Sequence, residues 1–453
     1  MLLRRLVMPL ALVLNACVPV TPAGDMPTRA VQMDSTLPPM KAFATAQPQR
    51  TYKANSDIAL DFVELSFALE SGRDLPVFTR FEGPITVRVT GQPGPTLNRD
   101  LAKLIRRLQT EARIDIRQVS SRSAANITIE AVTRADIRRA LPHAACFVVP
   151  GITSISQYKA ARRTARTNWT LLETREKLAI FLPSDASPQE VRDCLHEELA
   201  QAIGPLNDLY RLPDSVFNDD NVHTVLTGFD MLILRAYYDP SLKSGMSRGQ
   251  VAARLPAILR RINPAGEGRA PQLVTRTPRE WSQAVQTALG PGASPSQRKT
   301  AAQRALSIAT ALGWQDHRRA FAHYANGRLL MATDPNAAQK HFAAADVFYA
   351  RTPGAHLHRA YVATQLAAHA ISRGDGTSAL MLIGPYMDRA AQNENAALLS
   401  TLMLLRAEAL ELQGRTGEAQ AVRLDSLGWA RYGFGPDWAV RAKLREIASL
   451  SPS

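Results

Sequence analysis

Five short stretches in the first half of the chain are apolar or alternate between apolar and polar residues, and each predicts a β-strand. They are residues 84–90, 114–119, 125–132, 145–149 and 177–182. Between the first two, leucines recur at helical spacing, which predicts a helix over 96–109. A helix followed by several strands favours a mixed sheet with helices packed on it, so the expected fold class is α+β.

The clearest helix start in the chain is Ser187-Pro188-Gln189-Glu190. Ser187 suits the cap, Pro188 suits the first helical position, and Glu190 is expected to bond back to the cap. The helix is predicted to end at Gly204. Apolar residues one turn apart predict its buried face, namely Val191, Leu195, Leu199 and Ala202. Two further helices are expected over 227–238 and 247–262.

From about residue 297 the chain is predicted to be all helix. Asp334, Gly374 and Gly414 mark loops spaced by 40 residues, and an alanine follows each loop at 338, 379 and 419. This weak repeat resembles tetratricopeptide-like helical hairpins, which implies a concave face for a protein or peptide partner. A plain helical bundle is the alternative. A second capping box, Thr277-Pro-Arg-Glu280, predicts another helix just before this region.

The first residues predict where the protein resides. A basic start at Arg4 and Arg5 and a short apolar run precede Leu14-Asn-Ala-Cys17, which resembles the lipobox of bacterial lipoprotein signal peptides. The resemblance implies lipid on Cys17 and a periplasmic, lipid-anchored protein; Val18 favours the outer over the inner membrane. An ordinary secretory peptide is the alternative.

These boundaries divide the chain into five parts. We expect a signal peptide over 1–17, a flexible linker over 18–56 and an α+β domain over 57–262. A linker with a short helix is expected over 263–296, and the helical repeats over 297–453.

The formal net charge is +14, but the basic residues are mostly arginines spread along the chain. Without a basic block or interleaved aromatics, no nucleic-acid partner is expected. Of the three cysteines, Cys146 and Cys194 remain once Cys17 is lipidated. In an oxidising compartment they are predicted to form a disulfide, with two free buried thiols as the alternative.

The helix after Ser187 carries the candidate chemistry. His196-Glu197 begins like a His-Glu-x-x-His zinc motif, but Ala200 occupies the last position. One residue further on, the sequence matches the metzincin spacing His-Glu-x-x-His-x-x-Gly-x-x-His. The matching residues are Glu197, Glu198, Gln201, Gly204 and Asn207. This stretch therefore resembles a degenerate metzincin, in which the element order also agrees and all three ligand histidines are replaced.

Three separated blocks are similar to an uncharacterised family of proteobacterial lipoproteins, the domain of unknown function number 2927. They are Cys194–Asp208, Ser215–Asn221 and Tyr237–Met246. The resemblance covers about residues 57–250 and implies no known activity.

By the metzincin resemblance, Glu197, Gln201 and Asn207 hold the metal-ligand positions, and Glu198 holds the position of the catalytic base. Amide oxygens are poor zinc ligands and suit calcium better, so no cofactor is predicted, although zinc or calcium would be the candidates. The alternative is that all four are ordinary polar residues. A metal pair of His196 and His223, and a cation-binding turn at 219–221, are weaker candidates.

These observations favour a lipid-anchored protein of the cell envelope with a metzincin-like domain and helical repeats. The expected role is non-catalytic binding or assembly on a pseudo-metalloprotease scaffold. A zinc-type metallopeptidase or hydrolase with a non-standard metal site is the alternative.

Overall fold

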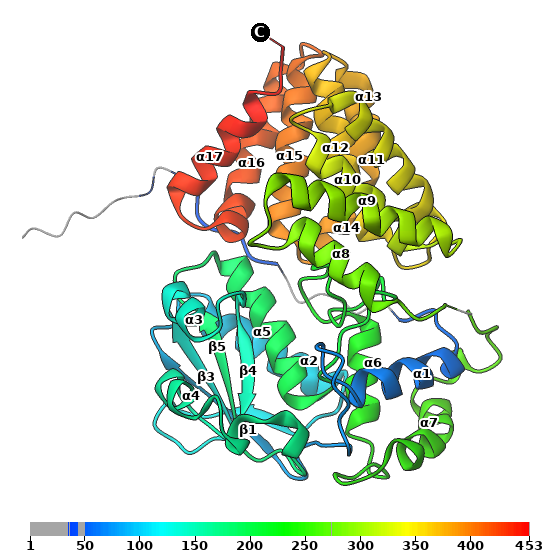
Figure 1. Cartoon of the computed structure of the whole chain (residues 1–453). Coiled ribbons are helices and arrows are strands. Elements are labelled where there is room, and N and C mark those ends of the chain that lie inside the picture. The colour runs from blue at the N-terminus through cyan, green and yellow to red at the C-terminus, as the bar shows by residue number, and fades with distance from the viewer. Residues whose placement is uncertain (1–34, 36, 44–49, 273, 453) are drawn as a thin grey trace, which may run out of the picture. The chain divides into compact units, whose positions relative to one another are not determined.

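The computed structural model describes residues 35, 37–43, 50–272 and 274–452. Its first half is a mixed α/β region (Figure 1). In chain order the elements are α1 (Asn55–Ser66), β1 (Ile85–Gly91), α2 (Leu97–Thr110), β2 (Ile116–Gln118), β3 (Ile127–Val132), α3 (Arg134–Ala140), β4 (Phe147–Pro150), α4 (Ile155–Ala161), β5 (Leu178–Pro183), α5 (Pro188–Ile203), α6 (Gly228–Tyr237) and α7 (Arg248–Ile262).

The five strands form one sheet in the order β2-β1-β3-β5-β4. All neighbours pair in parallel except the edge strand β4, which runs antiparallel to β5. Successive side chains of β5 point to opposite faces of the sheet. Ala179 and Phe181 pack with residues of α3 and α4, whereas Leu178 and Ile180 share a core with α2 and α5. The sheet is therefore covered on both faces, and α5 follows β5, the strand that pairs with both β3 and the edge strand β4.

Every strand and helix predicted in this region is present within two residues of the expected bounds. Ser187 caps α5 by accepting the backbone N–H of Glu190, as predicted. The return bond from Glu190 is not made, because its carboxylate instead accepts a hydrogen bond from Arg134 at 2.9 Å. The capping box at Thr277 is wrong: α8 (Arg279–Leu289) begins after Pro278 and has no side-chain cap.

The second half is helical. Its elements are α8 (Arg279–Leu289), α9 (Pro295–Ala311), α10 (His317–Leu330), α11 (Pro335–Ala350), α12 (His356–Ser372), α13 (Gly376–Ile383), α14 (Met387–Gln392), α15 (Ala396–Glu411), α16 (Thr416–Phe434) and α17 (Asp437–Ala448), with short 3-10 turns at Pro264–Gly266 and Gly384–Tyr386. Asp334 caps α11, and Gly374 and Gly414 adopt positive φ in the turns before α13 and α16. The alanines at 338, 379 and 419 are all buried, each in the first turns of its helix.

From Leu37 onward the chain packs into one unit. Residues 37–43, within the expected linker, contact α16: Lys41 donates its backbone N–H to Gly428, and Phe43 stacks on Trp429 with ring centroids 4.4 Å apart. Within the described ranges, no helix combines the length and apolarity needed to span a membrane. Cys17 and the predicted signal peptide lie outside the described residues.

Candidate functional site

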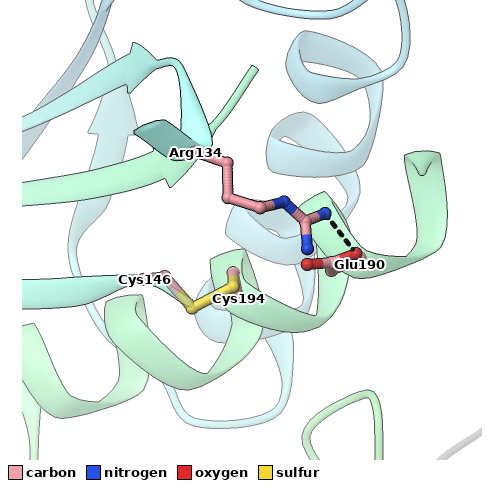
Figure 2. The surroundings of a disulfide bond; sticks show 4 residues. All are labelled: Arg134, Cys146, Glu190 and Cys194. Atoms are coloured by element: carbon pink, nitrogen blue, oxygen red, sulfur yellow. Dashed lines mark hydrogen bonds and ion pairs between the residues drawn. A yellow bond between two sulfur atoms is a disulfide. The ribbon is translucent and has the colours of Figure 1, made fainter. Parts of the chain in front are cut away.

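The N-terminal half of α5 is fixed by covalent and polar contacts. Cys194 forms the predicted disulfide with Cys146, which ties α5 to the start of β4 (Figure 2). One turn earlier, Glu190 pairs with Arg134 of α3. Gln189 bonds both the Asn395 side chain and the backbone N–H of Ala397 at the start of α15. The helix is thus anchored to the sheet on one side and to the helical region on the other.

The C-terminal end of α5 is fixed by close packing. A Cβ on Gly204 would lie 2.4 Å from the side chain of Leu234 in α6, so a larger residue does not fit there without displacing its neighbour. After this turn, Asn207 donates its amide N–H to the backbone carbonyl of Glu64 at 3.0 Å. The loop that follows α5 is therefore held against the end of α1.

Between these two ends, α5 carries the predicted site residues. Glu198 is only 5% exposed, and its Oε2 has no hydrogen-bond partner. Glu197 is half-buried, one residue earlier. Gln201 is buried and donates its amide N–H to Glu70 at 2.9 Å. The structure brings Glu197, Glu198 and Gln201 close to Glu70, whereas the amide of Asn207 is directed to the backbone of α1.

Five acids form what we call the carboxylate cluster: Glu70, Glu197, Glu198, Asp208 and Asp219. The pKa of Glu197 rises to about 8, first because its surroundings remove water and then because Glu70, Asp219 and Asp193 repel its charge. Loss of hydration, followed by the charges of neighbouring acids, holds the pKa of Glu198 and of Asp208 well above the usual range. The folded protein therefore disfavours the simultaneous ionisation of these acids.

The cluster borders a cleft of about 1160 Å³ between the α/β region and the helical region. Glu70 and Asp219 line one wall, and Gln283 and Gln286 of α8 line the other. Gln286 donates to Asp219 at 3.3 Å across the cleft. Because both regions contribute to it, the cleft is a feature of the whole folded unit.

The three predicted ligand positions make separate contacts, since Gln201 donates to Glu70 and Asn207 donates to the backbone of Glu64. In the part of the chain that the structure describes, no group of three or more His, Cys, Asp and Glu side chains is arranged to hold one. The two histidines considered from the sequence are engaged elsewhere. His196 Nδ1 accepts the N–H of Leu226, and His223 Nε2 lies 2.9 Å from the carbonyl oxygen of Pro213.

Asp220 follows Asp219 in the chain but has a different environment. Its Oδ2 lies 2.7 Å from Nε2 of His358 in α12, and both side chains are almost completely buried. His223 and His317 pack near His358, with ring centroids 6.0 and 6.4 Å from it. Burial lowers the pKa of both His223 and His317 to about 4. Asp220 therefore takes part in a buried junction with the helical region, and both Asp219 and Asp220 line the cleft.

Sequence reasoning identified part of this site. Glu197, Glu198 and Gln201 were candidates, and Asp219 lay in the weaker turn candidate. Glu70 and Asp208 were missed, because they come from loops that only the fold brings to α5. The sequence signal for Asp208 was its place beside Asn207 in the motif; Glu70 had none.

Together these features define a class of protein: a mixed α/β domain in which α5, the helix after β5, carries two acids of the cluster, joined to a helical region that forms the other wall of the cleft. Residues 55–257 match the family described as protein of unknown function (DUF2927), so this segment is a domain of that family. The match covers less than half of the chain and leaves out the helical region. No curated protein and no solved structure matches the chain.

Proposed function

We propose that this chain is a lipid-anchored, non-catalytic binding or assembly module of the cell envelope, built on a pseudo-metalloprotease scaffold. The observation that carries the proposal is the cleft, because its walls come from both regions and two acids of the carboxylate cluster, Glu70 and Asp219, line it. Concave sites with a few unsatisfied polar groups are typical of ligand binding. The helical region suits a protein or peptide partner.

The metzincin resemblance is part of this proposal. In its favour, the chain runs strand, helix, strands, then α5 and the turn at Gly204, in the order expected from the resemblance. The ligand positions hold Glu197, Gln201 and Asn207 in place of histidines. A retained scaffold that has lost its ligands favours binding over catalysis.

Occupation of the cleft can be tested by photo-crosslinking in cells. A photoreactive residue replaces Gln283, which is exposed on the cleft wall, or Arg117, which is exposed on the edge strand β2 as a control. We expect a defined crosslinked partner from position 283 and not from position 117. Equal crosslinking at both positions, or none at either, would contradict the proposal.

A metal-dependent hydrolase is the second candidate, and one observation favours it. Glu198 is a buried carboxyl with a raised pKa at the position of the catalytic base, and such a group suits acid–base chemistry. Metal analysis of the purified protein, together with peptide and peptidoglycan hydrolysis by the wild type and Glu198→Gln, separates the two. We expect no stoichiometric zinc and no Glu198-dependent cleavage; the opposite result would overturn the binding proposal.

The lipid anchor is a separate part of the proposal. Replacing Cys17 by Ser should move the protein from the membrane fraction to the soluble fraction of cells. Retention of the variant at the membrane would show that something other than lipid on Cys17 holds it there.

A further inference from the structure

In the described part of the chain, the carboxylate cluster lacks an ion pair that would balance its charge. Among the described residues, no salt bridge involves Glu70, Glu197, Glu198, Asp208 or Asp219. Nor does a lysine or arginine contribute to lowering the pKa of any of them. This is unexpected in a chain with a net charge of +14. Acids gathered without a counter-charge are costly, so a ligand that supplies the charge would relieve the repulsion.

Two unpartnered oxygen atoms point to a ligand independently of the charge. Glu198 is only 5% exposed, so water cannot readily reach its carboxyl group, and no described residue donates a hydrogen bond to its Oε2. Asp208 Oδ1 is also buried and without a partner. Buried polar atoms in native proteins are rarely left unpaired, and each exception needs a cause. Here the two acceptors without partners belong to the same cluster, and the charges of its other acids raise the pKa of both carboxyl groups.

The arrangement of the acceptors distinguishes between kinds of cation. A metal ion needs several oxygens converging at roughly 2.0–2.6 Å, and the described side chains provide no such group. An ammonium group instead donates three hydrogen bonds of roughly 2.7–3.2 Å to acceptors that lie farther apart. Carboxylates spread over α5 and two loops therefore suit an ammonium group better.

The cleft also provides room for the chain that carries such a group. Its volume of about 1160 Å³ far exceeds the space of a single ion. Tyr210 and Phe321 contribute aromatic surface to its lining, which suits the alkyl stem of a lysine, and the amides of Gln283 and Gln286 suit a peptide backbone.

We propose that the carboxylate cluster binds the ammonium group of a lysine side chain that a partner peptide inserts into the cleft. This inference rests on the proposed binding function and names the chemistry of the ligand. The peptide backbone lies between the α/β wall and α8, and the lysine meets Glu70 and Asp219, the acids of the cluster named above as lining the cleft.

The inference predicts that peptide binding depends on pH and releases protons. A bound ammonium favours the ionised carboxylates and lowers their pKa values, so binding releases protons from the cluster into solution. The peptide should therefore bind more tightly as the pH rises from 6 toward 8. Nonspecific attraction to the surface is not expected, because the rest of the chain is strongly basic.

The test uses a fluorescent ten-residue peptide of alternating serine and lysine, and the same peptide with every lysine acetylated, which removes the charge. Anisotropy titrations use the full chain, Glu198→Gln, Glu70→Gln and the control Glu173→Gln. Glu70 is exposed at the cleft, so its variant should fold even if Glu198→Gln does not; Glu173 is exposed outside the cleft. Calorimetry in buffers of different ionisation enthalpy measures the released protons.

We expect binding of the lysine peptide only, weakened about tenfold or more by Glu198→Gln and Glu70→Gln and unchanged by Glu173→Gln. Proton release should accompany binding. Equal binding of the acetylated peptide, or tight binding of calcium or zinc chloride without peptide binding, would overturn the inference. If the lysine peptide does not bind while a photoreactive residue at position 283 still crosslinks a partner, the inferred ligand chemistry is wrong and the proposed binding function stands. Glu198-dependent hydrolysis would overturn the function itself.

Discussion

The two halves of α5 differ in how their polar side chains are satisfied. In the N-terminal half, Gln189, Glu190 and Arg192 each make hydrogen bonds or ion pairs, with only Nε of Arg192 left without a partner among the described residues, and Cys194 is covalently bound. In the C-terminal half, Glu197 and Glu198 have no hydrogen-bond donor from the described residues. One helix therefore combines an anchored end with an end that carries unbalanced charge.

This difference separates structure from function. Satisfied polar groups fix a helix in place, whereas groups with shifted pKa values and missing partners are typical of functional sites. The contacts of the N-terminal half hold the C-terminal half in place, although the repulsion between the acids of the C-terminal half disfavours that position. Changes to the first half should therefore cost stability, and neutral changes to the second half should increase it.

The largest loss is expected from Arg192→Met. Arg192 is buried and donates to Thr224 and to the backbone carbonyl of Glu394, which joins α5 to the helical region. Its removal deprives Asp193 of its charged partner and should lower the free energy of unfolding by about 3–5 kcal/mol. Urea denaturation measures this, with the exposed Arg163→Met as control. A loss no larger than that of the control would contradict the anchoring role.

The disulfide should contribute slightly less. It closes a loop with a sequence separation of 48 residues, so replacing Cys146 and Cys194 by Ser should lower the free energy of unfolding by about 3–4 kcal/mol. A reducing agent should destabilise the wild type and leave the double variant unchanged. If the reducing agent destabilises both equally, the loss does not come from this bond.

The buried histidines predict a loss of stability in acid. His223 and His317 have folded pKa values of about 4, below the ordinary 6.5. Their contribution to the free energy of unfolding is therefore complete above pH 6.5 and is lost as the pH falls toward 4. The charged groups around them are Asp220, Asp316 and Arg318, together with His358. We expect each histidine to account for a loss of about 2–3 kcal/mol over this range.

Replacing both His223 and His317 by Gln should flatten this part of the pH profile, because Gln can still donate to the carbonyl groups but cannot gain a charge. An unchanged acid limb in the double variant would assign the loss to other groups.

The sequence predicts those parts of the structure that depend on interactions between residues close together in the chain. Strand alternation, the Ser187 cap and the Gly204 turn depend on neighbouring residues, so their positions followed from the pattern. The partners of Glu190 and Asp220 did not, since Arg134 and His358 are distant in the chain. The same limit applies to the site: Glu197 and Glu198 follow from the motif, whereas Glu70 reaches them only through the fold.

The unfolding free energy of Glu198→Gln at pH 7.5 tests the central claim most directly. Because the folded protein raises the pKa of Glu198, the wild type loses stability as the pH rises from its unfolded value near 4.5. The neutral variant avoids this cost and should be more stable by about 1–2 kcal/mol, a gain that shrinks as the pH is lowered toward 4.5. A variant that is less stable than the wild type, or a gain that does not change with pH, would contradict the account.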